Sequence, residues 1–359
     1  MTDGAPRLDV RLLDRGEVGT LDPAAWDRLS DVSVAANPFY ERWSLVPALR
    51  HFEKSERVYV VATYDAGRLV ALFPVVIKRK AWLLRYVAVW QFPSCLSTDV
   101  LIEPGLPLSE VADAIMMKLK VSIMISPTHG SSGFDVTPAS NFCQISRERK
   151  AVTRFSTWEE YLARLPGKHR RETKRVIARL FEEEGARYVA SDVDLRSKWY
   201  PAYLDVEQDS WKKAAGKTIS SDPDKAKYFE EAIQSGEQRG KVEFQALLND
   251  DEVLAISFRF KGQLKACEVK TSYREKYKKL YPGVVLESLN IKHISEEDYT
   301  IVDSCSFGNE VVERIWPDKI AVSRTTLFKK DAIGRLARFF YQGFKRLGFI
   351  SSVGKMACR

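Results

Sequence analysis

The sequence predicts an α+β protein with mixed α/β sheets, in which two copies of one fold follow each other along the chain. Three observations lead to this prediction. The chain has 359 residues, which suits two domains of ordinary size. Its 45% hydrophobic and 29% charged residues are typical of a globular protein with a substantial core. Both halves also show the same order of expected elements, a β-hairpin followed by a third strand, a helix and a further strand.

The first half, residues 1–150, is expected to begin with helices over residues 21–54. A hairpin follows, because Asp65-Ala66-Gly67 supplies a turn between two β-rich runs. The remaining expected elements are strands over 82–90 and 99–103, a helix over 108–119 and a strand over 121–126. Residues 127–150 are rich in Ser, Pro, Gly and Thr without a clear period, so they are expected to be connecting structure.

The second half, residues 151–330, is expected to open with four helices and then to repeat the plan of the first. The helices are expected over 158–165, 168–184, 195–213 and 223–239. The hairpin is expected over 242–261, the third strand over 264–272, and the helix over 283–297. A strand over 300–305, a short helix over 311–316 and a last strand over 320–328 complete it. Residues 331–359 form a basic tail with a C-terminal amphipathic helix.

The distribution of charge limits the class of partner. The net charge of +8 lies entirely in residues 324–359, and the rest of the chain is neutral. The basic character therefore belongs to the tail, and no DNA-binding fold is expected. The first residues show no signal peptide, and the longest apolar run, residues 69–77, contains Pro74. We therefore expect a cytoplasmic protein.

The cysteines and histidines predict no metal site. The five cysteines are scattered and are expected to be reduced thiols, and the four histidines make no ligand spacing with them.

The stretch over residues 264–290 is the main candidate for a ligand site. A strand is followed by a tyrosine-rich connector, and Pro282-Gly283 then opens a helix. Unpaired backbone N–H groups and the positive end of the helix dipole would favour a phosphate there. The alternative is an ordinary turn, because Pro-Gly pairs are common in turns.

Glu268 and Lys270 are candidates for catalysis because the two-residue strand period places them on one face. A buried Glu268 would have a raised pKa and could accept a proton from an attacking hydroxyl or amine. The alternative is an ion pair without chemistry. Asp303 either orients a substrate or caps the following turn. Tyr273 is a candidate, with Tyr277 and Tyr281 of the same connector, to donate a proton to a leaving thiolate, and the alternative for all three is packing in the loop.

The helix from residue 168 has basic residues at its start and glutamates at its end, which opposes the helix dipole at both ends. Arg170 and Arg171 at the basic end are therefore candidates to bind an external anion. The alternative is a solvated face with pairs such as Arg179 with Glu183.

The tail helix has an apolar stripe over residues 333–347 with a basic opposite side. This composition predicts either peripheral association with an anionic membrane, at the inner face of the membrane, or docking of the stripe on the protein itself.

Several motifs in order carry a resemblance to a known family. They cover the chain to about residue 328 and are Asn37-Pro38-Phe39-Tyr40-Glu41, Pro47-Ala48-Leu49, Lys168-His169-Arg170-Arg171-Glu172, Pro282-Gly283-Val284-Val285-Leu286, Asp303 and Trp316-Pro317-Asp318-Lys319. With them the sequence resembles the CelD-like acetyltransferases of bacterial cellulose and exopolysaccharide gene clusters. These belong to the GNAT superfamily and are similar to the tandem-GNAT Fem-type transferases. The family often has Tyr-Lys where this chain has Val312 and Glu313.

The resemblance implies tandem GNAT-like acyltransferase folds with acetyl-CoA or another acyl-CoA as co-substrate. The acyl-CoA would enter where residues 266–270 separate from residues 303–305, so that Cys305 lines the gap. Its pyrophosphate would lie over Gly283, Val284 and Val285, and its 3′-phosphate is one anion that Arg170 and Arg171 could bind.

The expected activity is the transfer of an acyl group, most simply acetyl, to a hydroxyl or amine of a sugar or glycan precursor. Two alternatives stay open. One is Fem-type transfer from aminoacyl-tRNA, although no basic stripe for tRNA is seen outside the tail and the helix from residue 168. The other is a non-catalytic partner of a polysaccharide synthase.

Overall fold

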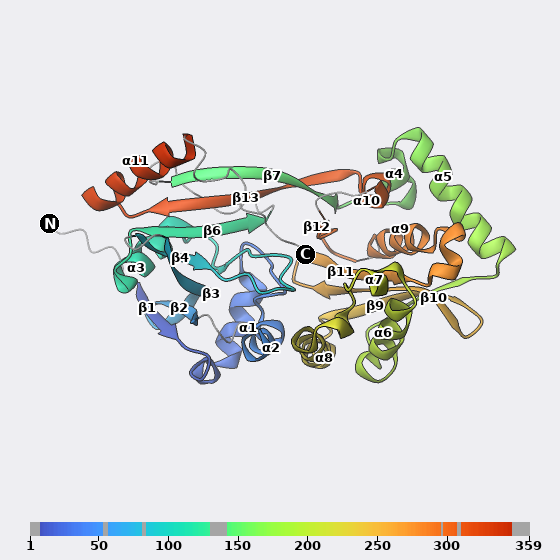
Figure 1. Ribbon diagram of the computed structural model, residues 1–359, viewed down its shortest axis with the longest axis horizontal. Coiled ribbons are helices and arrows are strands. Elements are labelled where there is room, and N and C mark those ends of the chain that lie inside the picture. Colours follow the sequence, from blue (N-terminus) through green and yellow to red (C-terminus); the bar gives the residue numbers. More distant parts are fainter. Residues whose placement is uncertain are drawn as a thin grey trace. The chain divides into compact units, whose positions relative to one another are not determined.

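A computed structural model of the chain divides into two compact units (Figure 1). The first contains Met1–Arg147 with Ala321–Arg359, and the second contains Glu148–Ile320. The structure describes residues 8–52, 57–80, 84–129, 142–295, 297–306 and 310–346. The first boundary lies near the expected residue 150. The strand expected at the end of the second half, in contrast, lies mostly in the first unit, because it pairs with a strand there.

The first unit contains a mixed sheet in the order β1-β2-β3-β4-β6-β13. Neighbouring strands are antiparallel except β4 and β6, which are parallel. The strands are β1 (Asp9–Leu13), β2 (Val58–Asp65), β3 (Arg68–Lys80), β4 (Leu84–Val89), β6 (Ile123–His129) and β13 (Asp318–Phe328), with the short β5 (Leu101–Ile102) beside β3. The helices are α1 (Pro23–Val32), α2 (Arg42–His51), α3 (Leu108–Leu119) and α11 (Ala332–Arg346).

The second unit contains a mixed sheet in the order β7-β12-β11-β10-β9-β8. Its one parallel pair among the described pairings is β11 with β12. The strands are β7 (Phe142–Thr153), β8 (Arg187–Ser191), β9 (Val242–Asn249), β10 (Glu252–Lys261), β11 (Lys265–Tyr273) and β12 (Ile301–Asp303). The α-helices are α4 (Trp158–Arg164), α5 (Gly167–Ala178), α6 (Tyr200–Gln208), α7 (Trp211–Ala214), α8 (Pro223–Glu237), α9 (Pro282–Ile294) and α10 (Glu310–Ile315).

The two units share one plan, which confirms the mixed α/β fold expected from the sequence. Each has an antiparallel hairpin, a third strand, a helix and then a strand parallel to the third. The strand that pairs with the other side of this parallel strand is not the one that follows it in sequence. β7 follows β6 in sequence but pairs with β12, and β13 follows β12 but pairs with β6.

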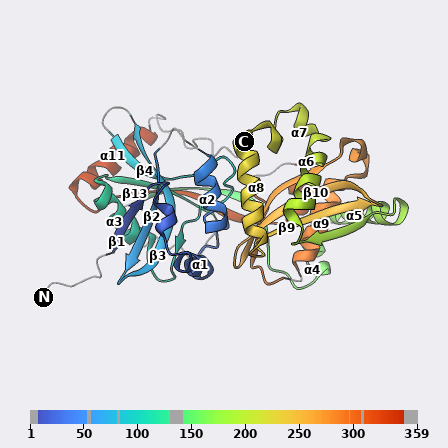
Figure 2. The ribbon, with the colours of Figure 1, turned by 90° about the horizontal axis from the view of Figure 1, so that it is seen from below.

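The sheet of the second unit has helices on both faces (Figures 1 and 2). On one face, Tyr203 of α6 and Phe229 of α8 pack their rings against Phe258 of β10. On the other, residues of α9 such as Val285 belong to one buried core with strand residues such as Ala266. The two faces therefore present different side chains of β11 to different helices.

Three strands were not expected from the sequence. These are β1, β8 and β7, the last of which lies partly in the stretch interpreted as connecting structure; residues 130–141 of that stretch lie outside the described residues. β7 contains four consecutive charged residues, so this part of it lacks the alternation of apolar and polar residues that predicts a strand. One of them, Arg149, is fully buried because it pairs with Asp303. No helix of the described residues is long and apolar enough to cross a membrane.

Candidate active site

The strands β11 and β12 separate soon after they pair. Their parallel pairing joins Lys265 to Ile301, Ala266 to Val302 and Cys267 to Asp303. β12 ends at Asp303, whereas β11 continues to Tyr273. The second half of β11 therefore has no partner from β12, and the sheet is open beside it. The resemblance implied a separation over residues 266–270 and 303–305, whereas Ala266 and Cys267 are still paired with β12.

A β-bulge in β11 separates Glu268 from Lys270. Arg259 of β10 pairs with Glu268 and Phe258 pairs with Lys270, so Val269 is the extra residue. Because neighbouring residues of β10 point to opposite faces, Glu268 and Lys270 also point to opposite faces. The expectation that they share one face is therefore wrong, since the two-residue period fails at a bulge.

Glu268 lies on the α9 face and is 6% exposed. Neither of its carboxylate oxygens has a hydrogen-bond partner among the described residues. Burial raises the pKa of Glu268 to about 7, although Arg259 opposes this increase. A carboxyl group with this pKa can accept a proton near neutral pH. The structure thus gives Glu268 the burial that the sequence hypothesis required.

Charged groups around Glu268 explain why its pKa remains raised beside an arginine. Arg259 is fully buried, and its Nε donates a hydrogen bond to Glu243 at 2.7 Å. Burial alone would raise the pKa of Glu243, but His293 and Arg259 lower it to about 2. The charge of Arg259 is therefore largely neutralised by Glu243. Glu287 of α9 adds a further negative charge that favours the protonated form of Glu268.

Lys270 lies on the opposite face, towards α6 and α7. Burial lowers its pKa. A second amine, that of Lys212 in α7, donates hydrogen bonds to the Thr271 carbonyl at 2.7 Å and to Ser272 Oγ at 2.9 Å. Burial, followed by the repulsion from Lys270, lowers the pKa of Lys212 to about 8. Lys212 thus anchors α7 to the unpaired half of β11. Sequence reasoning missed it, because nothing local marks a lysine that reaches across the fold.

Asp303 is held at the point where the two strands separate. Its carboxylate binds Arg149 in a fully buried ion pair, with Lys265 Nζ at 3.5 Å. Its Oδ1 also accepts a hydrogen bond from the Cys305 backbone N–H at 2.8 Å. The sequence left two roles open for Asp303, orienting a substrate or capping the following turn. The hydrogen bond to the Cys305 N–H is that of a turn cap.

Two clusters of possible metal-ligand side chains occur in the described part of the chain. In one, Cys267 and Cys305 lie with Asp303, and in the other His293 lies with Glu243 and Glu297. In both clusters an arginine already pairs with a carboxylate. Cys305 follows the end of β12 and lies near Cys267 and Asp303, and burial raises the pKa of its thiol.

The N-terminus of α9 lies next to the connector that follows β11. Tyr281, with a φ of 53°, immediately precedes Pro282 at the first helical position. The Val285 N–H bonds back to the Tyr281 carbonyl at 3.1 Å. The N–H groups of Gly283 and Val284 precede that bond, so the helix offers them no acceptor. Pro282, Val284 and Val285 are buried, whereas Gly283 is partly exposed.

Gly283 also contacts Tyr273, which completes the link between β11 and α9. A Cβ atom at Gly283 would lie 3.3 Å from Cδ1 of the Tyr273 ring. The glycine therefore lets the tyrosine lie directly against the helix start. Burial raises the pKa of Tyr273, so its phenol stays protonated and available as a hydrogen-bond donor.

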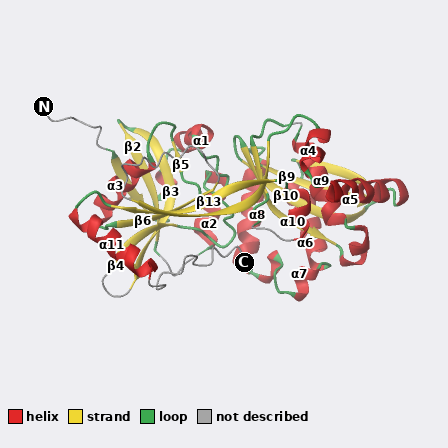
Figure 3. Ribbon diagram, turned by 90° about the horizontal axis from the view of Figure 1, so that it is seen from above, coloured by secondary structure: helices red, strands yellow, loops and turns green. Residues whose placement is uncertain are grey.

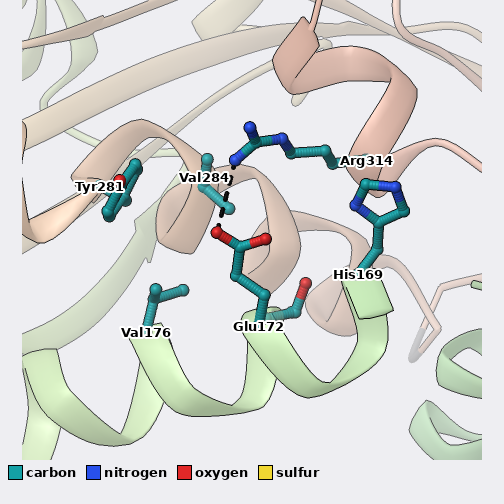
Figure 4. A pocket seen from close by; sticks show the side chains of 7 residues that line it. His169, Glu172, Val176, Tyr281, Val284 and Arg314 are labelled. Carbon is teal, nitrogen blue, oxygen red and sulfur yellow. Dashed lines mark hydrogen bonds and ion pairs between the residues drawn. The ribbon is translucent and has the colours of Figure 1, made fainter. Parts of the chain in front are cut away.

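A small pocket adjoins this helix terminus (Figure 4). Tyr281 and Val284 of the α9 region form one side of it, and His169 and Glu172 of α5 form another. Arg314 of α10 closes it, with Nη1 at 3.5 Å from Glu172 Oε1. The pocket therefore brings together the starts of α5 and α9, which the sequence had indicated separately.

Arg170 and Arg171 lie in the first turn of α5, beside His169 and Glu172. They do not line the pocket: Arg171 is exposed and Arg170 is partly exposed. Their guanidinium groups lie close to Gly167 instead. An anion bound by these arginines would therefore lie outside the pocket, at the outer side of the α5 start.

Glu313, which stands where the resembled family often has a lysine, pairs with Lys150 at 2.8 Å. Lys150 lies on β7, so a lysine is present near this place in the fold although the sequence position differs.

A mixed sheet whose parallel strands separate beside a helix N-terminus is the arrangement that the resemblance to the GNAT superfamily implied. Residues 167–310 match the family described as an acetyltransferase (GNAT) domain. This match covers less than half of the chain and lies almost entirely in the second unit. The second unit therefore holds an acetyltransferase domain, and the protein is an enzyme of the acyltransferase class.

Solved structures with the same fold cover most of the chain. FemX is 10% identical, with a TM-score of 0.55, over 89% of this chain and 98% of that chain. A conserved protein of unknown function from Bacteroides thetaiotaomicron is 13% identical, with a TM-score of 0.54, over 89% and 100%. The C-terminal domain of a putative lysylphosphatidylglycerol synthetase from Agrobacterium fabrum is 9% identical, with a TM-score of 0.51, over 90% and 95%. At these identities the similarity shows the fold alone. No curated protein matches the chain.

Proposed function

We propose that the second unit transfers an acyl group, most simply acetyl, from acyl-CoA to a hydroxyl or amine of a sugar or glycan precursor. The observation that carries this proposal is Glu268, a buried carboxyl group with a pKa of about 7 beside the open half of β11. The sequence resemblance to CelD-like acetyltransferases supports a role in exopolysaccharide synthesis.

The residues present fit an acyl-CoA. The N–H groups of Gly283 and Val284 are suited to phosphate oxygens, and the gap beyond Cys267 and Asp303 is suited to an extended pantetheine arm. When bound, acyl-CoA supplies the thioester that the acceptor attacks. Arg170 and Arg171, which lie outside the pocket at the start of α5, would bind its 3′-phosphate rather than its pyrophosphate.

The chain then contributes a base and a donor. Glu268 accepts the proton of the acceptor hydroxyl or amine, directly or through water, which raises the nucleophilicity of that group. The Tyr273 phenol donates a hydrogen bond towards the leaving sulfur. Lys212 fixes the part of β11 between these two residues through its hydrogen bond to Thr271.

The test is a two-step measurement on the full chain. Calorimetry with acetyl-CoA and longer acyl-CoAs is expected to show binding at micromolar to low millimolar concentration. Mass spectrometry of mixtures with amino sugars, nucleotide sugars and oligosaccharides is then expected to show a product heavier by one acyl group. Absence of binding to every acyl-CoA at millimolar concentration would refute the proposal.

Two other functions are distinguished when charged tRNA and a co-purification assay are added to this experiment. A Fem-type enzyme would leave acyl-CoA unbound and would transfer an amino acid when charged tRNA is supplied at low salt. A non-catalytic partner of a polysaccharide synthase would give no product with either donor and would co-purify with another protein.

A further inference from the structure

We propose that α11 attaches this protein peripherally to an anionic membrane surface, with the exposed apolar side of the helix inserted among the lipids. The sequence left two alternatives for the apolar stripe of this helix, insertion into a membrane or docking on the protein. The structure separates them, because it shows which residues of the helix contact the first unit.

The docked side of α11 is narrow. Ala337 and Tyr341 pack against a small core formed by Ile123, Ile125 and Phe328. The Tyr341 ring meets that of Phe328 edge to face at 5.5 Å, and Thr326 Oγ1 donates a hydrogen bond to its hydroxyl at 3.3 Å. In Figure 3, α11 follows β13 as a helix at the edge of its unit. These contacts hold the helix in place.

Four large apolar side chains in the part of α11 whose side chains are described are exposed to solvent. Ile333 is 65% exposed, Leu336 56%, Phe339 71% and Phe340 54%. At 100° per residue they span one continuous sector of about 120°, next to the docked side. Four large apolar side chains exposed together on one short helix are uncommon on a protein surface that meets only water. Docking on the first unit therefore does not account for them.

The charge of the helix favours a membrane as the occupant. α11 contains four basic residues and no acidic residue over Ala332–Arg346. Arg335 lies about 40° beyond Phe339 around the helix axis, so it flanks the apolar sector where lipid headgroups would be. An anionic bilayer satisfies both the apolar sector and the basic flank, and its width accommodates the whole sector at once. The inference does not depend on the chemistry of the second unit.

Vesicle flotation with the full chain tests the proposal. We expect binding to vesicles of phosphatidylcholine with phosphatidylglycerol, little binding to phosphatidylcholine alone, and a decrease as salt rises. The double substitution Leu336→Ser and Phe340→Ser should reduce binding on the order of tenfold or more. Met117→Ser is the control, since Met117 is 58% exposed on α3 of the same unit. It should bind as the unchanged chain does.

A fluorescence measurement guards against a folding defect. In Phe339→Trp the added indole should shift its emission to the blue with anionic vesicles, whereas in Met117→Trp it should not. Unchanged emission together with equal flotation of all variants would overturn the proposal. A blue shift that depends on protein concentration without vesicles would also overturn it, because the sector would then bind a second copy of the chain.

Discussion

Replacing Glu268 with Gln should remove a loss of stability that the unchanged chain undergoes as pH rises through about 7. Because burial raises its pKa from 4.5 to about 7, the folded chain favours the protonated carboxyl. This contribution to stability is fully present below the unfolded pKa and is lost as pH rises through about 7. At roughly 1.36 kcal/mol per pKa unit, the loss is about 3 kcal/mol in total, and about 2–3 kcal/mol between pH 5 and pH 8.5.

Urea denaturation followed by tryptophan fluorescence measures this difference. The free energy of unfolding of Glu268→Gln, minus that of the unchanged chain, should rise by about 2–3 kcal/mol from pH 5 to pH 8.5. Any constant cost of the amide cancels in this comparison. Glu182→Gln, at an exposed glutamate in the same unit, should show no such rise. A difference that stays constant across this pH range would refute the assigned burial of Glu268.

The same substitution should lower acyl-transfer turnover by roughly 10²–10⁴-fold with little change in acyl-CoA affinity. Since the base is active when deprotonated, the turnover of the unchanged chain should rise with pH through about 7 and then level off. Near-normal turnover of the variant would show that Glu268 is not the catalytic base.

Further substitutions test the surroundings of the site. Gly283→Asp should weaken acyl-CoA binding at least tenfold by calorimetry, because its carboxylate would repel phosphate and its Cβ would crowd Tyr273. Gly283→Ala isolates the crowding, and equal loss in both variants would contradict the phosphate role. Arg149→Met should cost about 3–5 kcal/mol in urea denaturation, because it leaves Asp303 buried without its partner. Arg149→Met with Asp303→Asn together should recover part of that cost, and purely additive losses would count against the pairing. Lys212→Met should cost about 1–3 kcal/mol by leaving a β11 carbonyl unpaired, whereas the exposed Lys213→Met should cost less than about 0.5 kcal/mol.

The repeated element order could be predicted from the sequence because each signal in it is local. A hairpin turn and a helix period both occupy a few neighbouring residues, so hairpins, third strands and helices were found in both halves. β7 was missed for the opposite reason. A strand can bury the charge of Arg149 because Asp303 pairs with it, and Asp303 lies far away in the sequence.

The candidate site shows the same limit. Glu268 could be selected as a candidate base because it lies on a predicted strand before a predicted helix, but its burial was only a condition of that hypothesis. Its face could not be predicted, because the bulge at Val269 depends on how β10 pairs with β11. Arg259 carried a weak signal, a charged residue within an otherwise apolar strand. Lys212 carried no sequence signal, because its contacts with Thr271 and Ser272 form only in the folded chain.

Because β6 pairs with β13 and β12 pairs with β7, the two units are completed at different times during synthesis. The open edge of β6 is completed by β13, which leaves the ribosome only after the whole second unit has been made. In the second unit, β12 pairs with β7, which is translated before the other strands of that unit. The first unit is therefore begun first and completed last. Until β13 is made, the backbone groups of β6 that pair with it have no strand partner. A nascent chain stopped before residue 321 would contain a complete acyltransferase unit beside an incomplete neighbour.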